Sequence, residues 1–128
     1  MKAIKIAALM TILLSFRVSL MAAGSSSYKP AVSKDVKLYN KGVKLMLDKE
    51  FVKAEKQFRK ALDRNERFAE AHNNLAYTLR KQGRDHFDEA LVHYNRAIEL
   101  KPNLPEPYMY RGVLYVQLGN KASALDDH

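Results

Sequence analysis

The chain is 128 residues long, 47% of them are hydrophobic, and none is cysteine. This length favours a single small domain, and the absence of cysteine excludes disulfides, thiolate metal sites and cysteine nucleophiles. The formal net charge of +8 makes an acidic partner or surface a hypothesis to be weighed.

Residues 1–24 have the organisation of a secretory signal peptide. Two lysines lie within the first five residues, an apolar stretch of eleven residues runs from Ile6 to Phe16, and small residues at 22–24 suit cleavage. A membrane-spanning helix needs about 20 largely apolar residues, and Arg17 ends this stretch early. We therefore expect a periplasmic or secreted bacterial protein. Two alternatives stay open, which are a membrane anchor through residues 4–23 and an unexported protein with an apolar start.

A short polar linker, residues 25–33, is followed by a helix-hairpin pattern that recurs about every 34 residues. Small residues recur in the first helix of each hairpin at Gly42, Ala76 and Gly112, and alanine recurs in the second helix at Ala54, Ala90 and Ala124. The first series is spaced by 34 and 36 residues and the second by 36 and 34, so a two-residue insertion within 84–86 accounts for both. Small residues at these positions let paired helices approach closely. The pattern divides the chain into units at 35–68, 69–104 and 105–128, of which the third is incomplete.

Apolar side chains of the second helices have helical spacing. In the first two units they are Phe51, Ala54, Phe58, Ala61 and Leu62, and then Phe87, Leu91, Tyr94, Ala97 and Ile98. We interpret them as core residues. Helix ends are marked by Gly83 and Gly119, which can close first helices, by Pro102, which follows a second helix, and by Pro105 or Pro107, which can open the next. The pattern predicts five helices and a short sixth over 121–128.

These positions resemble the signature of the tetratricopeptide repeat family, which has a small residue in the first helix, an alanine in the second, an aromatic residue four further on, and an alanine three after that. The first two units match it with Gly42, Ala54, Phe58 and Ala61, and with Ala76, Ala90, Tyr94 and Ala97. The third offers Tyr108, Gly112 and Ala124 before the sequence stops at His128. The resemblance covers roughly residues 35–128. It implies an all-α fold, a right-handed α-solenoid of about two and a half hairpins whose last helix is truncated.

The resemblance also implies a non-enzymatic scaffold or adaptor that binds a peptide or protein on the concave face formed by the first helices. The candidate contacts are the non-core positions of those helices, namely Tyr39, Val43, Met46, Asn73, Asn74, Tyr77, Arg80, Lys81, Met109, Tyr110, Val113 and Gln117. Asparagine can hydrogen-bond to an extended peptide backbone, and tyrosine supplies contact area with few rotors to freeze. Ordinary packing is the alternative interpretation of each tyrosine and methionine.

One subtype of the family clamps a partner's C-terminal carboxylate with lysine, asparagine and arginine. At those places this sequence has Tyr39, Val43, Asn74, Glu106 and Tyr110, of which only Asn74 matches. A ligand held by shape and by backbone hydrogen bonds is therefore the better expectation.

A basic stripe on the first helix carries a second hypothesis. Lys34, Lys37, Lys41 and Lys44 share one helical face, and the matching residues of the second unit are Ala71, Leu75 and Thr78 for the last three lysines. Lysines at stacking positions are typical of a capping unit that stays in solvent. Binding of an anionic polymer or membrane surface through this stripe is the alternative, and nucleic acid is the less expected ligand.

Nothing in the sequence predicts catalysis, a cofactor or a metal site. The histidines, His72, His86, His93 and His128, lack metal-ligand spacing and are interpreted as solvated or helix-capping residues. Asp88 and Glu89 suit the first turn of a helix. A further alternative is an accessory subunit or a fragment of a larger repeat protein. Because a repeat unit cannot bury its own apolar face, we also expect self-association through the incomplete C-terminal repeat.

Overall fold

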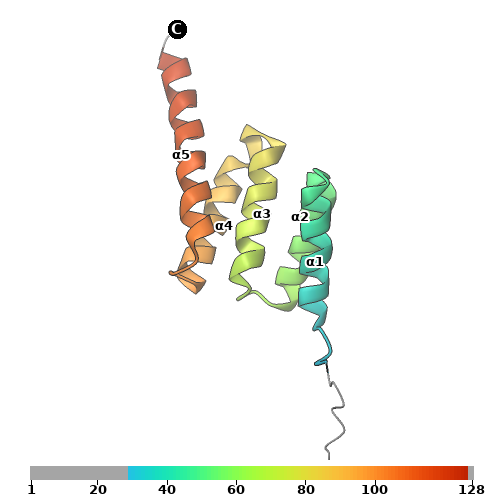
Figure 1. Cartoon of the computed structure of the whole chain (residues 1–128). Coiled ribbons are helices and arrows are strands. Elements are labelled where there is room, and N and C mark those ends of the chain that lie inside the picture. The colour runs from blue at the N-terminus through green and yellow to red at the C-terminus, as the bar shows by residue number, and fades with distance from the viewer. Residues whose placement is uncertain (1–28, 127–128) are drawn as a thin grey trace, which may run out of the picture. The chain divides into compact units, whose positions relative to one another are not determined.

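The computed structural model describes the backbone of residues 29–126 and the side chains of residues 29–119. Its helices belong to one compact unit that begins at Val32. In chain order they are α1 (Lys34–Leu47), α2 (Phe51–Arg64), α3 (Ala69–Gln82), the short 3₁₀ helix η1 (Arg84–His86), α4 (Phe87–Leu100) and α5 (Pro105–Asp126) (Figure 1). The all-α prediction is confirmed. The leader and the first four residues of the linker, residues 1–28 in all, lie outside the described residues.

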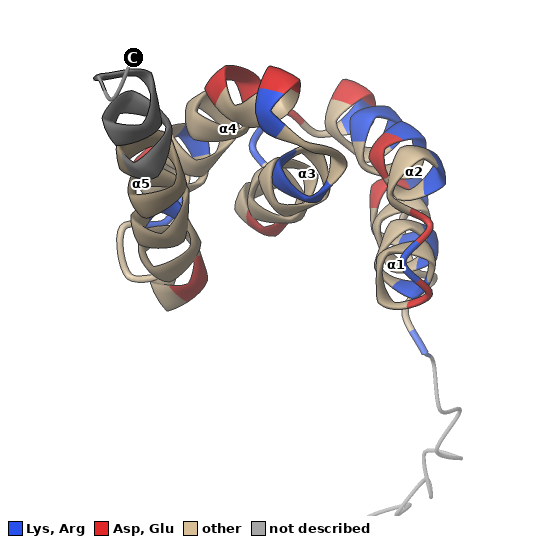
Figure 2. Ribbon diagram, turned by 90° about the horizontal axis from the view of Figure 1, so that it is seen from above, with Lys and Arg blue, Asp and Glu red and all other residues tan. Residues whose placement is uncertain are grey.

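The helices form two complete hairpins, α1 with α2 and α3 with α4, and α5 packs against α4. Figure 2 shows that α1, α3 and α5 line one inner side, while α2 and α4 lie behind them. The core contains the fully buried side chains of Phe58, Leu75, Leu79, Tyr94 and Leu114. Among the described residues no helix is long and apolar enough to cross a membrane.

The predicted close approach of paired helices is confirmed in the two complete hairpins. A Cβ atom added to Gly42 would lie 2.7 Å from Cε1 of Phe58, and Ala54, Ala76 and Ala90 are fully buried. At Gly112 the same prediction is wrong, because an added Cβ would meet no heavy atom within 4 Å. No described side chain covers that face of α5, so nothing there requires a small residue.

Helix ends follow the predicted signals except at Gly119. Gly83 ends α3 with a φ of 121°, and the two-residue insertion forms η1. However, α5 continues through Gly119 to Asp126, so the predicted short sixth helix is wrong. A glycine inside a helix costs only about 1 kcal/mol relative to alanine. A separate helix of two turns has too few hydrogen bonds to offset its nucleation, so the straight continuation is favoured.

Candidate functional site: a groove on the inner helices

A pocket of about 170 Å³ lies where the three inner helices come together. Its walls are Met46 and Leu47 from α1, Asn74 and Tyr77 from α3, and Tyr110 from α5. Four of these five residues were predicted as partner contacts. Leu47 was missed, although its position four residues after Val43 on the same helix could have revealed it.

Asn74 is held in a fixed orientation at the pocket wall. Its Nδ2 donates to the hydroxyl of Tyr39 at 3.1 Å, and its Oδ1 accepts from Nδ2 of Asn73 at 3.1 Å. Each of these two atoms keeps capacity for one more hydrogen bond. The side-chain amide of Asn74 can therefore pair with both the N–H and the C=O of a peptide.

Asn73 has a different place from the one predicted. Its side chain is only 5% exposed, and its Oδ1 is buried without a hydrogen-bond partner. The prediction that Asn73 is a surface contact is therefore wrong. Adjacent residues of a helix point about 100° apart, so one asparagine can be buried while the next is exposed. The residue types alone do not show which of the two is buried. Asn73 instead orients the side-chain amide of Asn74 by donating a hydrogen bond to its Oδ1.

Tyr39 connects the polar wall to the core. Its ring centroid lies 4.8 Å from that of Phe68 and 5.8 Å from that of Phe58. Burial raises the pKa of the Tyr39 hydroxyl above its usual value of 10.0. The hydroxyl is therefore neutral at physiological pH and can donate as well as accept.

Arg80 lies beside the pocket, and its guanidinium is positioned by aromatic rings. The guanidinium carbon is 5.3 Å from the ring centroid of Tyr77 and 5.9 Å from that of Tyr110, and the two rings pack edge to face at 5.2 Å. Nη1 donates to Oε1 of Gln117 at 3.3 Å. Such cation–π contacts are worth about 0.5 to 2 kcal/mol depending on desolvation. The charge is therefore held in place at the groove.

Within residues 29–119, Arg80 forms no ion pair, whereas Arg59 and Arg96 each pair with glutamates. Nε of Arg80 and the hydroxyl of Tyr94 are both buried without a hydrogen-bond partner. Burial raises the pKa of Tyr94 to about 12, and the positive charge of Arg80 acts in the opposite direction. The groove thus holds a positioned cation that has no carboxylate partner among the described side chains.

The remaining predicted contacts lie around this pocket. Val43 is partly buried against the core, and Nζ of Lys81 lies 6.0 Å from the centroid of Tyr77. Met109 and Val113 are exposed on α5 and do not line the pocket. The structure therefore groups Met46, Asn74, Tyr77, Arg80 and Tyr110 most closely, with Gln117 and Tyr39 as their supports.

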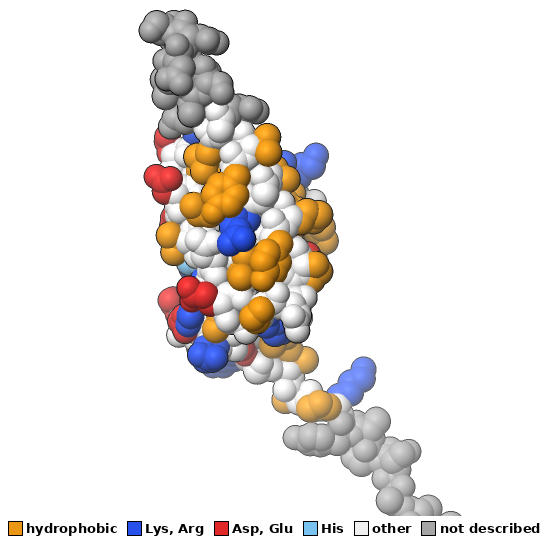
Figure 3. All heavy atoms as spheres, turned by 90° about the vertical axis from the view of Figure 1, so that its left-hand side faces the viewer, with side chains coloured by type: hydrophobic (Ala, Val, Ile, Leu, Met, Phe, Trp, Pro, Cys, Tyr) orange, Lys and Arg blue, Asp and Glu red, His pale blue; other side chains and the backbone are white. Residues whose placement is uncertain are grey.

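The outer side of α5 carries an exposed apolar surface. Its members are Tyr108, Met109, Val113, Tyr115 and Val116, and Figure 3 shows apolar side chains gathered on that side of the molecule with a basic one among them. Arg111 lies over the rings of Tyr108 and Tyr115, and its Nη1 donates to Asn95. Self-association through the third unit would use this surface, and it stays a prediction.

A buried histidine pair connects α3 and α4, and the interpretation of His72 and His93 as solvated or capping residues is wrong. Their Nδ1 atoms are 2.9 Å apart, and Nε2 of His72 lies 2.7 Å from the carbonyl oxygen of Glu66. Because a carbonyl only accepts, Nε2 of neutral His72 donates, and Nδ1 of His93 then donates to Nδ1 of His72. Sequence spacing gave no signal, because the two residues meet only through hairpin packing.

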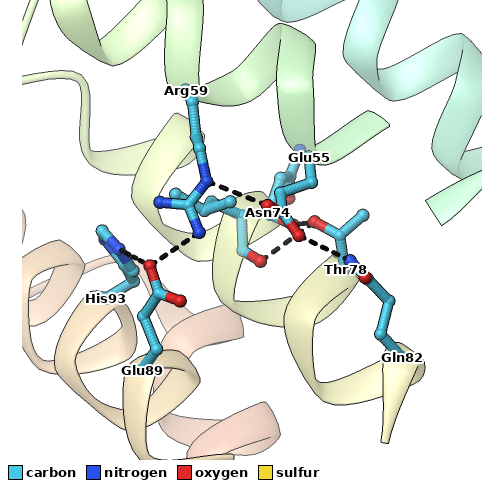
Figure 4. Close-up of polar contacts among 8 residues, drawn as sticks. Glu55, Arg59, Asn74, Thr78, Gln82, Glu89 and His93 are labelled. Atoms are coloured by element: carbon cyan, nitrogen blue, oxygen red, sulfur yellow. Dashed lines mark hydrogen bonds and ion pairs between the residues drawn. The ribbon is translucent and has the colours of Figure 1, made fainter. Parts of the chain in front are cut away.

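The histidine pair lies beside a network of ion pairs. Figure 4 shows Arg59 between Glu55 and Glu89, with His93 beyond Glu89. Arg59 donates from Nε to Glu55 at 3.0 Å and from Nη2 to Glu89 at 2.6 Å. Nε2 of His93 is 3.7 Å from Glu89. Burial lowers the pKa of both histidines, and for His93 the charge of His72 adds to this effect.

Comparison with known proteins found a matching family model and a similar human protein. A family model described as a TPR repeat matches residues 84–119. The human protein Tetratricopeptide repeat protein 6 is 35% identical over 74 residues, which are 58% of this chain and 14% of that protein. These matches confirm the predicted resemblance to the tetratricopeptide repeat family. The chain spans about a seventh of the length of the human relative, so the whole protein's partners do not transfer to it.

Two solved structures have the same fold as this chain. The TPR2B domain of yeast Sti1, in its complex with pHsp70, superposes with a TM-score of 0.63 at 25% identity, over 72% of each chain. A chain of the CopN–Scc3 complex superposes with a TM-score of 0.62 at 23% identity, over 74% of this chain and 56% of that one. Family members are typically interaction modules without enzyme activity, and the fold is that of a protein-binding scaffold.

Proposed function

We propose that the groove of α1, α3 and α5 binds an extended segment of a partner protein, which places an apolar side chain in the pocket and a carboxylate against Arg80. The observation that carries this proposal is a cation held by two tyrosine rings beside an apolar pocket, with no acidic partner in the part of the chain that the structure describes. A buried or partly buried cation without a counter-ion is unfavourable, and a ligand carboxylate relieves that cost.

The size of the pocket limits the apolar residue of the ligand. A volume of about 170 Å³ compares with the share of about 30 Å³ that a water molecule occupies in the liquid. One apolar side chain of the size of leucine or methionine fits this volume. Tyr77 and Tyr110 supply flat walls, and tyrosine is among the residue types enriched at binding hot spots.

Asn74 supplies recognition of the main chain. Its Nδ2 and Oδ1 each keep one free hydrogen-bonding position at the pocket wall. An extended peptide can use both, which fixes the register of the ligand and so determines which of its side chains enters the pocket. The proposed ligand is a segment with an apolar residue next to an acidic one in an extended conformation.

The test is a peptide library with one apolar and one acidic position, screened against the full chain by fluorescence polarisation. The best peptide should bind at least about tenfold more weakly to Tyr77→Ala and to Arg80→Gln, because hot-spot truncations cost more than about 1 to 2 kcal/mol. Tyr115→Ala and Arg111→Gln are matched controls, because they make the same replacements on the outer side of α5. If the control and groove variants weaken binding equally, the groove is not the binding site.

We propose an exported or envelope context for this scaffold, supported by the signal-like pattern of residues 1–24. Expression with the leader in a bacterial host, followed by fractionation and determination of the N-terminus, tests it. A periplasmic product that begins near Gly24 or Ser25 is the expected outcome. An intact product in the cytosol contradicts the proposal, and an intact product in the membrane favours the anchored alternative.

A further inference from the structure

Equivalent faces of the two hairpins differ in their surroundings: the face is packed in the second hairpin and exposed in the first. Gly42 and Ala76 are equivalent, so Lys37, Lys41 and Lys44 correspond to Ala71, Leu75 and Thr78. The three α3 residues are buried, whereas the three lysines are exposed. Figure 1 shows α3 between the first hairpin and the later helices, while among the described helices α1 and α2 have neighbours on one side only. The same helical face is thus a stacking face in α3 and a solvent face in α1.

Two hollows lie on this bare face. One, of about 330 Å³, is lined by Lys34, Lys37, Leu38, Lys41 and Arg64. The other, of about 450 Å³, is lined by Leu38, Lys60, Asp63 and Arg64. Both share Leu38, a partly buried apolar side chain, with Arg64. We call this surface the basic face, and it combines an apolar floor with five cations and one carboxylate.

Lys44 does not line either hollow, so the basic face differs from the stripe expected from the sequence. The basic face also contains Arg64 and Lys60 of α2. The spacing of lysines within α1 could not show that residues of α2 lie beside them. Figure 2 shows the concentration of basic residues on α1 and α2. Within residues 29–119, none of the five cations of the basic face is in an ion pair with a carboxylate.

The junction between the two hairpins shows which chemistry such a face requires. Arg96 of α4 donates from Nε and Nη2 to Glu66 at 2.7 and 2.9 Å, which is a bidentate pair across the junction. Since Ala54 and Ala90 are equivalent, Lys60 takes the place of Arg96 in the first hairpin. Glu66 lies in the turn between α2 and α3, and an acidic residue of a docked segment can pair with Lys60 as Glu66 pairs with Arg96.

We propose that the basic face is a docking surface for an acidic amphipathic helix of a partner protein, separate from the peptide groove. An apolar side chain of that helix fills the hollow over Leu38, and flanking carboxylates pair with Lys37, Lys41 and Lys60. A purely apolar helix is less favourable, because it offers no carboxylate to the lysines and any ammonium group that it buries without a partner is destabilising. A second copy docking through α5 is disfavoured too, because the outer side of α5 offers apolar side chains and Arg111.

The apolar floor distinguishes this occupant from a polyanion. A phosphate or sulfate polymer neutralises cations but has no apolar group to place over Leu38, and Asp63 repels it. An amphipathic helix with apolar and acidic residues at spacings of three and four matches the lysine spacing of three and four on α1. Polyanions and anionic membranes are therefore outcomes that the test must separate.

The probe is a synthetic helical peptide of about 20 residues, which spans about 30 Å, with leucine and glutamate on one face, titrated into the full chain by calorimetry. The control peptide has glutamine in place of glutamate. Lys37→Glu/Lys41→Glu should weaken binding of the acidic peptide by at least about tenfold. A lysine version of the peptide should recover affinity for that double variant, because the charge complementarity is then restored in reverse.

Lys56→Glu/Arg67→Glu is the matched control, because it changes the net charge equally at exposed cations outside α1 that do not line the hollows. It should change the affinity by less than about threefold. Equal losses in the two double variants would show diffuse attraction only and overturn the proposal. Tight binding of heparin or of phosphatidylserine vesicles that Leu38→Ala leaves unchanged, together with no binding of the acidic helix, would overturn it in favour of a polyanion or a membrane.

Discussion

Replacing Gly42 by alanine tests the packing of the first hairpin, and Gly112→Ala is its matched control. Gly42 is buried against Phe58, whose Cε1, Cδ1 and Cζ atoms would lie 2.7, 2.8 and 3.0 Å from the new methyl group. Phe58 is fully buried and its ring packs against Tyr39, so it has little room to retreat. Gly112 occupies the equivalent repeat position, is exposed, and has no heavy atom within 4 Å of the added Cβ.

Two opposing contributions, helix propensity and overpacking, set the change in the free energy of unfolding that Gly42→Ala causes. Alanine is better than glycine inside a helix by about 1 kcal/mol, and overpacking a dense core costs about 1 to 3 kcal/mol. The contacts at Gly42 are below 3.4 Å for three ring atoms at once, so we expect the upper part of that range and a net destabilisation of about 1 to 2 kcal/mol. Gly112→Ala has only the favourable term, so it should stabilise by up to about 1 kcal/mol.

Thermal unfolding followed by circular dichroism measures both changes. For a domain of this size about 1 kcal/mol corresponds to about 4 to 8 °C, so Gly42→Ala should lower the Tm by about 5 to 15 °C and Gly112→Ala should raise it by a few degrees. Phe58→Leu should reduce the penalty of Gly42→Ala, because it removes the ring atoms that clash. Stabilisation by Gly42→Ala as large as that of Gly112→Ala would refute the close approach of α1 and α2.

The remaining predictions concern the junction between the hairpins and one turn. Burial holds the folded-state pKa of His72 and His93 below the ordinary 6.5, so their contribution to stability is complete above about pH 6.5 and is lost as the pH falls through the lowered values. Urea unfolding at about pH 7.5 and about pH 5 should show this loss, and His93→Gln should reduce it. Gly83→Ala should destabilise by about 1 to 3 kcal/mol in thermal unfolding, because a φ of 121° with a ψ of −179° is nearly restricted to glycine. A double-mutant cycle on Arg59 and Glu89 should give a coupling below about 1 kcal/mol that falls with salt, since the side chains are 40% and 43% exposed.

The hairpins and their core could be predicted because their requirements are local and repeated. Two helices that cross closely need a small residue on one and space for a ring on the other, and Gly42 with Phe58 satisfies both. The period of the pattern then places the same pair in the next unit as Ala76 and Tyr94. The error at Gly119 has a different origin. A glycine permits a turn, but the turn forms only where a sufficiently long second helix follows to pack against the first.

The candidate groove was predictable only as a set of helix faces. Sequence periodicity placed Tyr77 and Arg80 on the inner side of their helix, but it gives no distance between α3 and α5. The contact of Arg80 with Tyr110 and Gln117 joins residues 30 and 37 positions apart, and it depends on how the helices cross. The pairing of His72 with His93 was missed for the same reason.

Within the described unit, arginines that pair with glutamates stabilise the fold, whereas an arginine without such a partner is available to a ligand. Arg59 and Arg96 join the two hairpins and pair with glutamates, which accounts for them through folding alone. Arg80 is positioned by two rings and Gln117, and it has no acid among the described residues. The ring contacts offset part of the cost of ordering Arg80, but no ion pair within residues 29–119 adds to them. A partner's carboxylate would supply the missing interaction, which is why Arg80→Gln should weaken peptide binding more than it lowers the Tm.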